Sequence, residues 1–165
     1  MDKARDTEFT EFMTGRWSSV LRLAYALTAD LGHAEDIAQS AFARAYASWL
    51  RVRRADDPDA YLRQIVINEN RKRFRKRRVT EHLSAALPDA AAGDASCDDR
   101  HALLSALRAL APRQRAVVVL RYWLDLSEAE TAAALNCSVG TVKSQASKGL
   151  AALRASAVLA EGELL

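Results

Sequence analysis

The stretch Leu126–Arg154, LSEAETAAALNCSVGTVKSQASKGLAALR, is typical of a helix, a tight turn and a second helix. Ser127 can cap the first helix while Glu130, three residues later, reaches back to the Ser127 N–H, which forms a capping box. Asn136 suits the turn because asparagine tolerates the left-handed conformation better than most residues. Ser138 can then cap the second helix. Small residues that would allow another helix to cross the first one closely are Ala132 and Ala133.

The second helix of this stretch has two contrasting sides at about 100° per residue. The apolar side, which we expect to be core, carries Val139, Val142, Ala146, Leu150 and Leu153. The opposite side and its flanks are small, polar or cationic and carry Thr141, Lys143, Ser144, Gln145, Ser147, Lys148 and Ala151. Such a face can enter the DNA major groove, where the capped helix start binds a phosphate and side chains reach base edges. The alternative is an ordinary helical hairpin that closes an all-α domain.

The composition favours an all-α protein with one medium domain or two small ones. The chain has 165 residues, 50% of them hydrophobic, with only six glycines and three prolines, so helices are expected throughout. The N-terminus is polar and no apolar run could span a bilayer, so we expect a soluble, cytoplasmic protein without membrane contact. Cys97 and Cys137 form no CxxC pair and the histidines show no ligand spacing, so no metal, cofactor or disulfide is expected.

Positive charge is concentrated in one segment. The net charge of the chain is only +3, yet residues 63–78 contain a single acid, Glu69, and eight bases: Arg63, Arg71, Lys72, Arg73, Arg75, Lys76, Arg77 and Arg78. A solvated helix face normally mixes both signs of charge, and this segment does not. The segment therefore predicts contact with a polyanion such as nucleic acid, the alternative being a plain solvated charge run.

The N-terminal part predicts helices on either side of a short turn. Apolar residues over 9–27 follow a helical spacing, and Gly32 is expected to end that helix. A second helix is expected over 34–50, with Glu35 and Asp36 in its first turn, where the helix dipole favours acids. Its expected inner residues are Ile37, Ala38, Ala41, Ala45 and Trp49.

A third helix is expected after a loop over residues 50–57. Pro58 suits the first turn of this helix, which should run over 59–75. Its predicted inner residues are Tyr61, Leu62, Ile65 and Val66, and Ile67 is expected on another side.

A change of composition separates this part from the C-terminal helices. Residues 83–100 contain Pro, Gly, small residues and acids with little to bury, so we interpret them as a flexible linker. Helices over 101–110 and 112–122 are then expected to close over the helix–turn–helix, with Leu103, Leu104, Leu107 and Leu110 inward. The predicted organisation is an N-terminal helical domain over 1–82, a linker over 83–100 and a C-terminal four-helix domain over 101–165.

Several short motifs of specific residues give information that the hydrophobic periodicity alone does not. They are Leu23-Ala24-Tyr25 before Ala34-Glu35-Asp36 and Gln39, Pro58-Asp59-Ala60-Tyr61-Leu62 leading to Asn68, Leu110-Ala111-Pro112-Arg113-Gln114-Arg115, and Val139-Gly140-Thr141-Val142-Lys143-Ser144. Together they resemble the motifs of bacterial RNA polymerase sigma factors of the extracytoplasmic-function type in the sigma-70 family. The resemblance covers about residues 9–154 and implies a two-domain factor that directs core polymerase to promoters and helps melt the minus-ten region.

The resemblance also implies roles for individual residues. Contacts with the polymerase beta′ clamp helices would come from Glu35, Asp36, Gln39 and Phe42. Contacts with the minus-ten element would come from Arg53, Arg54, Arg63, Gln64, Asn68, Arg71, Lys72 and Arg75. The recognition helix would read the minus-thirty-five element as duplex through Thr141, Lys143, Ser144, Gln145, Ser147 and Lys148. Acids suited to the polymerase RNA channel are Asp89, Asp94, Asp98 and Asp99.

The implied partners are promoter DNA and core RNA polymerase, which the chain would contact at the clamp helices and the beta flap. An anti-sigma protein is a further candidate partner. The free chain is expected to be a monomer. Gln145 and Lys148 stand where the family often has arginine, so its promoter preference cannot be copied onto this chain. A helix–turn–helix regulator that binds an operator without polymerase is the alternative. A helical RNA binder would leave the groove-facing helix unexplained, and no phosphate loop, GxSxG, HExxH or Cys/His pair indicates an enzyme.

Overall fold

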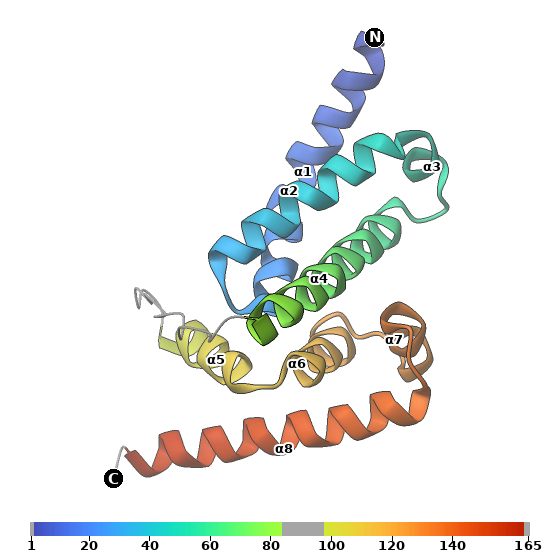
Figure 1. The fold of residues 1–165 in the computed structure, drawn as a ribbon. Helices are drawn as coiled ribbons and strands as arrows, with labels where there is room; N and C mark the ends of the chain where they lie inside the picture. The colour runs from blue at the N-terminus through green and yellow to red at the C-terminus, as the bar shows by residue number, and fades with distance from the viewer. Residues whose placement is uncertain (1, 84–97, 164–165) are drawn as a thin grey trace. The chain divides into compact units, whose positions relative to one another are not determined.

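The computed structural model describes residues 2–83 and 98–163, and every regular element in this part of the chain is helical (Figure 1). The predicted all-α class is confirmed. The chain divides into two compact units, Met1–Tyr25 with Asp30–Ala90 and Ala26–Ala29 with Ala91–Leu165.

The first unit is a helical bundle of α1 (Lys3–Thr28), α2 (Leu31–Ala47), α3 (Trp49–Arg54) and α4 (Pro58–Leu83), of which the last residues of α1 group with the second unit. α2 and α4 pack against each other, and the short α3 contacts both (Figure 1). Apolar faces of these helices form the core, which includes Val20, Leu23, Ala24, Ile37, Ala38, Ala41, Phe42, Ala45, Val52, Leu62, Val66 and Ile67. Burying each large side chain of this kind contributes about 1.5–3 kcal/mol.

The turn between α1 and α2 differs from the predicted stop at Gly32. Ala29 makes the turn in the left-handed conformation, with φ of 53°. The Asp30 side chain then caps α2 by accepting a hydrogen bond from the His33 N–H at 2.9 Å. This cap satisfies an amide that the helix start leaves without an intrahelical partner. Gly32 therefore lies inside the first turn of α2 instead of ending α1.

The loop predicted over residues 50–57 is wrong for most of its length, because α3 extends through Arg54. Val52 is fully buried there and Trp49 nearly so. Burial of these two side chains favours a helical turn. The sequence did not indicate this turn, because most residues around them are arginines and aspartates. The next helix starts at Pro58 as predicted, but Ile67 is a core residue, 1% exposed, instead of lying on an outer side.

An aromatic cluster joins the first half of α1 to the end of α2. Phe9 makes edge-on contacts with Tyr46 and Trp49, with ring centroids 5.0 and 5.3 Å apart, a geometry that aromatic pairs prefer. The Tyr46 hydroxyl donates a hydrogen bond to Asp6 Oδ1 at 2.5 Å. This bond to the carboxylate raises the pKa of Tyr46 above its ordinary value of 10.0, because ionisation would break it.

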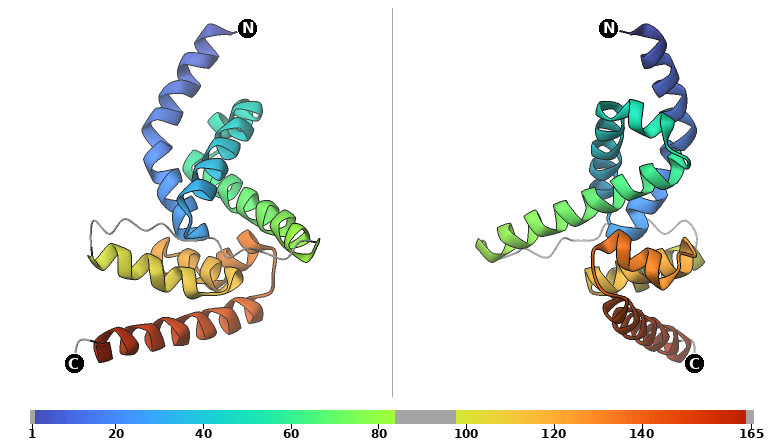
Figure 2. Two further views of the ribbon diagram at one scale, coloured as in Figure 1. Left: turned by 60° about the vertical axis from the view of Figure 1, so that its left-hand side comes forward. Right: turned by 90° about the vertical axis from the view of Figure 1, so that its right-hand side faces the viewer.

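The second unit contains α5 (Asp98–Ala109), α6 (Pro112–Val118), a π-helical turn η1 (Val119–Trp123), α7 (Glu128–Leu135) and α8 (Val139–Glu163). The long α8 runs along α5, α6 and α7 (Figure 2). The core of the second unit includes Leu107, Leu110, Ala116, Val117, Leu120, Thr131, Ala132, Ala134, Val142 and Ala146. A Cβ on Gly149 of α8 would lie 2.7 Å from the Val118 Cγ2, so α6 and α8 approach closely because this position has no side chain.

Three side chains of this unit depart from the predicted core. Leu103 is 56% exposed and Val139 is 40% exposed, although both were expected to point inward. Ala133 is also exposed, whereas Ala132, predicted with it as a close-packing residue, is buried. Of the predicted linker, residues 84–97 lie outside the described residues, including Asp89, Asp94 and Cys97, whereas Asp98 and Asp99 begin α5.

The π turn η1 changes what the predicted covering helix presents to solvent. The Leu124 N–H donates to the Val119 carbonyl at 3.0 Å, five residues back instead of four. Tyr122 and Trp123, at the end of this turn, are each 51% exposed, although the helix over 112–122 was expected to close over the helix–turn–helix. Widened turns of this kind are frequent at functional sites.

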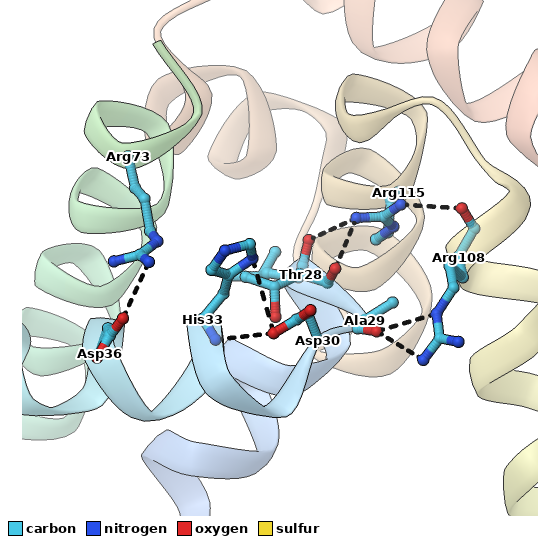
Figure 3. A network of polar contacts seen from close by, with 9 residues as sticks. Thr28, Ala29, Asp30, His33, Asp36, Arg73, Arg108 and Arg115 are labelled. Carbon is cyan, nitrogen blue, oxygen red and sulfur yellow. Dashed lines mark hydrogen bonds and ion pairs between the residues drawn. The ribbon is translucent and has the colours of Figure 1, made fainter. Parts of the chain in front are cut away.

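Arg115 holds helix ends together within the second unit. Its five N–H donors are all used, since the guanidinium donates to the carbonyls of Leu27, Thr28, Leu107, Arg108 and Leu110 at 2.7–3.3 Å. Arg108 donates twice to the Ala29 carbonyl nearby (Figure 3). Carbonyls at helix C-termini carry partial negative charge, so they can stabilise a buried guanidinium.

Candidate nucleic-acid interface

The predicted helix–turn–helix forms as α7, a turn and α8. Its capping box is present, with the Glu130 N–H donating to Ser127 Oγ at 3.0 Å and the Ser127 N–H donating to Glu130 Oε2 at 3.4 Å. Asn136 takes the left-handed conformation, with φ of 53° and ψ of 51°. Ser138 caps α8 by accepting from the Thr141 N–H at 3.0 Å. The capping box, the left-handed Asn136 and the Ser138 cap are therefore confirmed.

The predicted DNA-reading side chains lie along the exposed side of α8. Lys143, Ser144, Ser147 and Lys148 are exposed, while Gln145 is half-buried. The core side of the same helix contains Val142 and Ala146, which pack on Val117, Ala132 and the half-buried Cys137. The Thr141 hydroxyl is within 2.9 Å of Ser138 Oγ, so this side chain takes part in the cap as well as bordering the exposed face.

A pocket of about 350 Å³ lies along one flank of α8. Three cationic side chains, Arg121, Lys143 and Arg154, line it together with one acid, Glu128. The remaining lining residues are Tyr122, Val142, Ala146, Ser147 and Leu150. Lys143 and Ser147 therefore lie on the pocket side of the predicted DNA face.

Arg121, Tyr122 and Arg154 were not among the predicted site residues. Arg121 packs over the Tyr122 ring at 5.5 Å from its centroid. The signal for Arg154 was available, because it follows Lys143 and Ser147 at spacings of eleven and seven residues on the same flank of one helix. No such signal was available for Tyr122, because the π turn that contains it was not predicted.

The predicted minus-ten residues lie on α3 and α4 of the first unit. Exposed members are Arg53, Arg54, Asn68, Lys72 and Arg75, and half-buried members are Arg63, Gln64 and Arg71. Gln64 Nε2 donates to Asn68 Oδ1 at 3.0 Å, so these amides are already linked along one helix face. Arg53 forms an ion pair with Glu8 at 3.1 Å, which reduces its positive charge toward an approaching phosphate.

The predicted polymerase-binding residues lie on α2. Glu35, Asp36 and Gln39 are exposed, but they follow the first helical turn, so the dipole interpretation loses its main support. Phe42 is only 3% exposed and stacks on Trp17 with centroids 5.8 Å apart. As a core side chain, Phe42 offers no docking surface, and it positions the exposed residues of α2 instead.

Asp36 is not isolated on this surface. Its Oδ2 lies 2.9 Å from the Arg73 Nη2 of α4 (Figure 3). A second pair, of reversed polarity, joins Arg44 of α2 to Glu69 of α4. The predicted polymerase face and the basic helix are therefore linked by charge across the α2–α4 contact.

Metal-binding clusters and membrane spans were also sought among the described residues. These residues contain no group of three or more His, Cys, Asp or Glu placed to hold a metal ion. None of their helices is both long and apolar enough to cross a membrane.

Comparison with known proteins assigns each unit a counterpart. Residues 18–80 match the family described as Sigma-70 region 2, and residues 100–153 match Sigma-70, region 4. The first match covers the end of α1, all of α2 and α3 and most of α4, and the second covers the helix–turn–helix.

Relatives match across nearly the full chain. An RNA polymerase sigma-E factor of Streptomyces coelicolor is 42% identical over 149 residues, which is 89% of this chain and 84% of that protein. The ECF RNA polymerase sigma factor SigW of Bacillus subtilis is 29% identical, covering 82% of this chain and 81% of that protein.

A solved structure shares the fold. The sigma factor RpoE of Bartonella quintana, solved in complex with the anti-sigma factor NepR, gives a TM-score of 0.68 at 24% identity, covering 90% of this chain and 96% of that one. With both sigma regions matched in order and relatives aligned along both units, the chain belongs to the sigma-70 family of bacterial RNA polymerase sigma factors, in its extracytoplasmic-function group.

Proposed function

We propose that this sigma factor binds core RNA polymerase, directs it to promoters through two separate DNA elements, and helps to melt the downstream one. The observation that carries the proposal is the pair of cationic helical surfaces, one on each family region. Polymerase supplies the chemistry of transcription, so the chain itself needs no catalytic residue.

The first unit is the proposed minus-ten and clamp-binding module. Exposed Glu35, Asp36 and Gln39 offer polar contacts to the clamp helices of polymerase. The basic face of α4 offers phosphate contacts to the melting strand through Arg71, Lys72 and Arg75. Melting a base step costs a few kcal/mol, which stacking and phosphate contacts must offset.

The second unit is the proposed minus-thirty-five module. A capped α8 with exposed Ser144 and Lys148 has the form of a recognition helix that enters the major groove. The polymerase beta flap is the proposed protein partner of this unit. Since NepR accompanies a structural relative, an anti-sigma protein is a further proposed partner for the chain.

The experiment that tests this function is run-off transcription with core polymerase and a pool of promoter fragments, with sequencing of transcript ends. Transcripts should depend on the added chain. An Arg71→Ala/Lys72→Ala variant should lower promoter opening and flatten the salt slope by about one unit per lost phosphate contact.

Changes in the recognition helix provide a matched test. Ser144→Ala or Lys148→Ala should alter the upstream sequences selected from the pool while binding to core polymerase stays intact. Loss of polymerase binding by these variants would count against the assigned roles of the two units.

The operator-binding alternative predicts a different outcome. A regulator of that kind would bind one DNA sequence tightly as an isolated chain and would give no transcripts when added to core polymerase. No feature of the described residues favours this alternative, because relatives that cover most of the chain are sigma factors.

A further inference from the structure

Two ion pairs of opposite polarity cross the contact between α2 and α4. In one, the acid Asp36 is on α2 and the base Arg73 is on α4, 2.9 Å apart (Figure 3). In the other, the base Arg44 is on α2 and the acid Glu69 is on α4. Because the two partners of each pair are distant in sequence, these pairs exist only in the folded first unit.

The two pairs differ in how accessible they are to another molecule. The Glu69 side chain is 12% exposed, which suits a structural pair that fixes the two helices. By contrast, the Asp36 side chain is 56% exposed and that of Arg73 is 37% exposed. A charged group of another molecule can therefore approach either partner of the Asp36–Arg73 pair.

Each partner of the accessible pair lies among residues assigned to a different ligand. Asp36 lies between Glu35 and Gln39 on the surface proposed to bind polymerase. Arg73 lies in the basic segment of α4, next to Lys72, on the helix proposed to bind DNA. The pair neutralises a carboxylate that one ligand would use and a guanidinium that the other would use.

We propose that Arg73 is a further DNA phosphate contact, held by Asp36 in the free protein and released when Asp36 binds a cationic group of polymerase. This proposal rests on the proposed function. Binding of polymerase and of DNA would then reinforce each other, and the coupling must be reciprocal because it is a property of one equilibrium. Exposed ion pairs are weak, so the coupling should change affinity by about 1.5- to 5-fold.

The pair lowers the positive charge that the free protein offers to DNA. A guanidinium bound to a carboxylate offers little net charge to a phosphate, so free protein would make one phosphate contact fewer. Loss of one contact lowers the dependence of single-strand affinity on salt by about 0.7 in logarithmic slope. The same contact would be regained in the assembled holoenzyme without any change of fold.

The test is a double-mutant cycle on the full chain, with fluorescence anisotropy of a labelled oligothymidylate as the readout. Asp36→Asn, which removes the holding charge, should tighten binding by about 1.5- to 5-fold and steepen the salt slope by about 0.7. Arg73→Gln should change the affinity of the otherwise unaltered free chain little. In the Asp36→Asn background, Arg73→Gln should abolish the gain.

A matched control separates this effect from a general increase in positive charge. Glu11 is exposed on α1, and Glu11→Gln changes the net charge by the same amount as Asp36→Asn. The proposal is overturned if both neutralisations tighten binding equally, or if Arg73→Gln has the same effect in both backgrounds. Arg73→Lys in the Asp36→Asn background should keep most of the gain, which excludes a folding defect as the cause of the loss.

A second arm uses the holoenzyme. With polymerase bound, Arg73→Gln should weaken promoter complexes by about 1.5- to 5-fold, in contrast to its small effect on the free chain. Run-off transcription by the unaltered chain reports on the proposed function independently. If the chain supports transcription but the effects of Asp36→Asn and Arg73→Gln are additive, only the proposed coupling is overturned. If the chain supports no transcription, the proposed function is overturned.

Discussion

Replacing Gly149 with alanine should destabilise the second unit even though alanine is the better helix former. The new Cβ would lie 2.7 Å from the Val118 Cγ2 and 3.5 Å from the Gln114 carbonyl oxygen. Valine cannot easily turn away, because its branched side chain has one strongly preferred rotamer in a helix. The overpacking costs about 1–3 kcal/mol, and the gain in helix propensity is at most about 1 kcal/mol. The net loss should therefore reach about 2 kcal/mol.

A second substitution makes this reasoning refutable. Val118→Ala removes the methyl group in question, so Gly149→Ala should be favourable in that background, with an interaction energy of about 1–3 kcal/mol in the cycle. Gly140→Ala is the control on the same helix, since its Cβ would meet nothing closer than Ser138 Oγ at 3.8 Å. Hydrogen exchange of the α6 and α8 amides reports opening of this unit alone. Stabilisation by Gly149→Ala in the unaltered chain would refute the close-packing argument.

Three further predictions follow from local features of the two units. Ser127→Ala should destabilise the second unit by about 0.5–2 kcal/mol because it removes the cap of α7, and urea unfolding should show it; an unchanged midpoint would mean that the cap contributes nothing. Gly15→Ala should stabilise the first unit by up to about 1 kcal/mol, because a Cβ there meets nothing within 4 Å, and a lower Tm would contradict this. The hydrogen bond to Asp6 raises the pKa of Tyr46, so the stability that this bond gives the folded chain is complete below pH 10.0, the ordinary pKa, and is lost as pH rises through the higher folded pKa. Ultraviolet titration, with Tyr46→Phe as the reference, should show that Tyr46 ionises at a higher pH than an ordinary tyrosine. Asp6→Asn should lower the pH at which it ionises.

Local signals in the sequence predicted the helix–turn–helix well because each depends on only a few neighbouring residues. The capping box of Ser127 and Glu130 and the left-handed Asn136 are satisfied within one turn of chain. Positions set by tertiary packing were harder. Val52 looked like part of a polar loop and Ile67 like an outer residue, yet both are buried by contacts with helices distant in the sequence.

In the candidate sites, too, the sequence predicted local features but not those set by contacts between helices. Residue type and periodicity located the exposed face of α8 and the basic face of α4. They could not show that Phe42 stacks on Trp17, or that Asp36 and Arg73 are paired. Both facts depend on which helix faces which, a property that periodicity within a single helix does not contain.

The π turn at Val119–Trp123 accommodates one more residue than an α-helical turn would. Deleting one residue from it would return the backbone to the ordinary bond from each N–H to the fourth preceding carbonyl. Five residues in a π turn cover about the same angle as four in an α-helix, so α7 and α8 would keep nearly the same orientation relative to α6. The turn that contains Tyr122 and Trp123 would change instead, so a deletion here should alter this part of the surface and leave the helix–turn–helix in place.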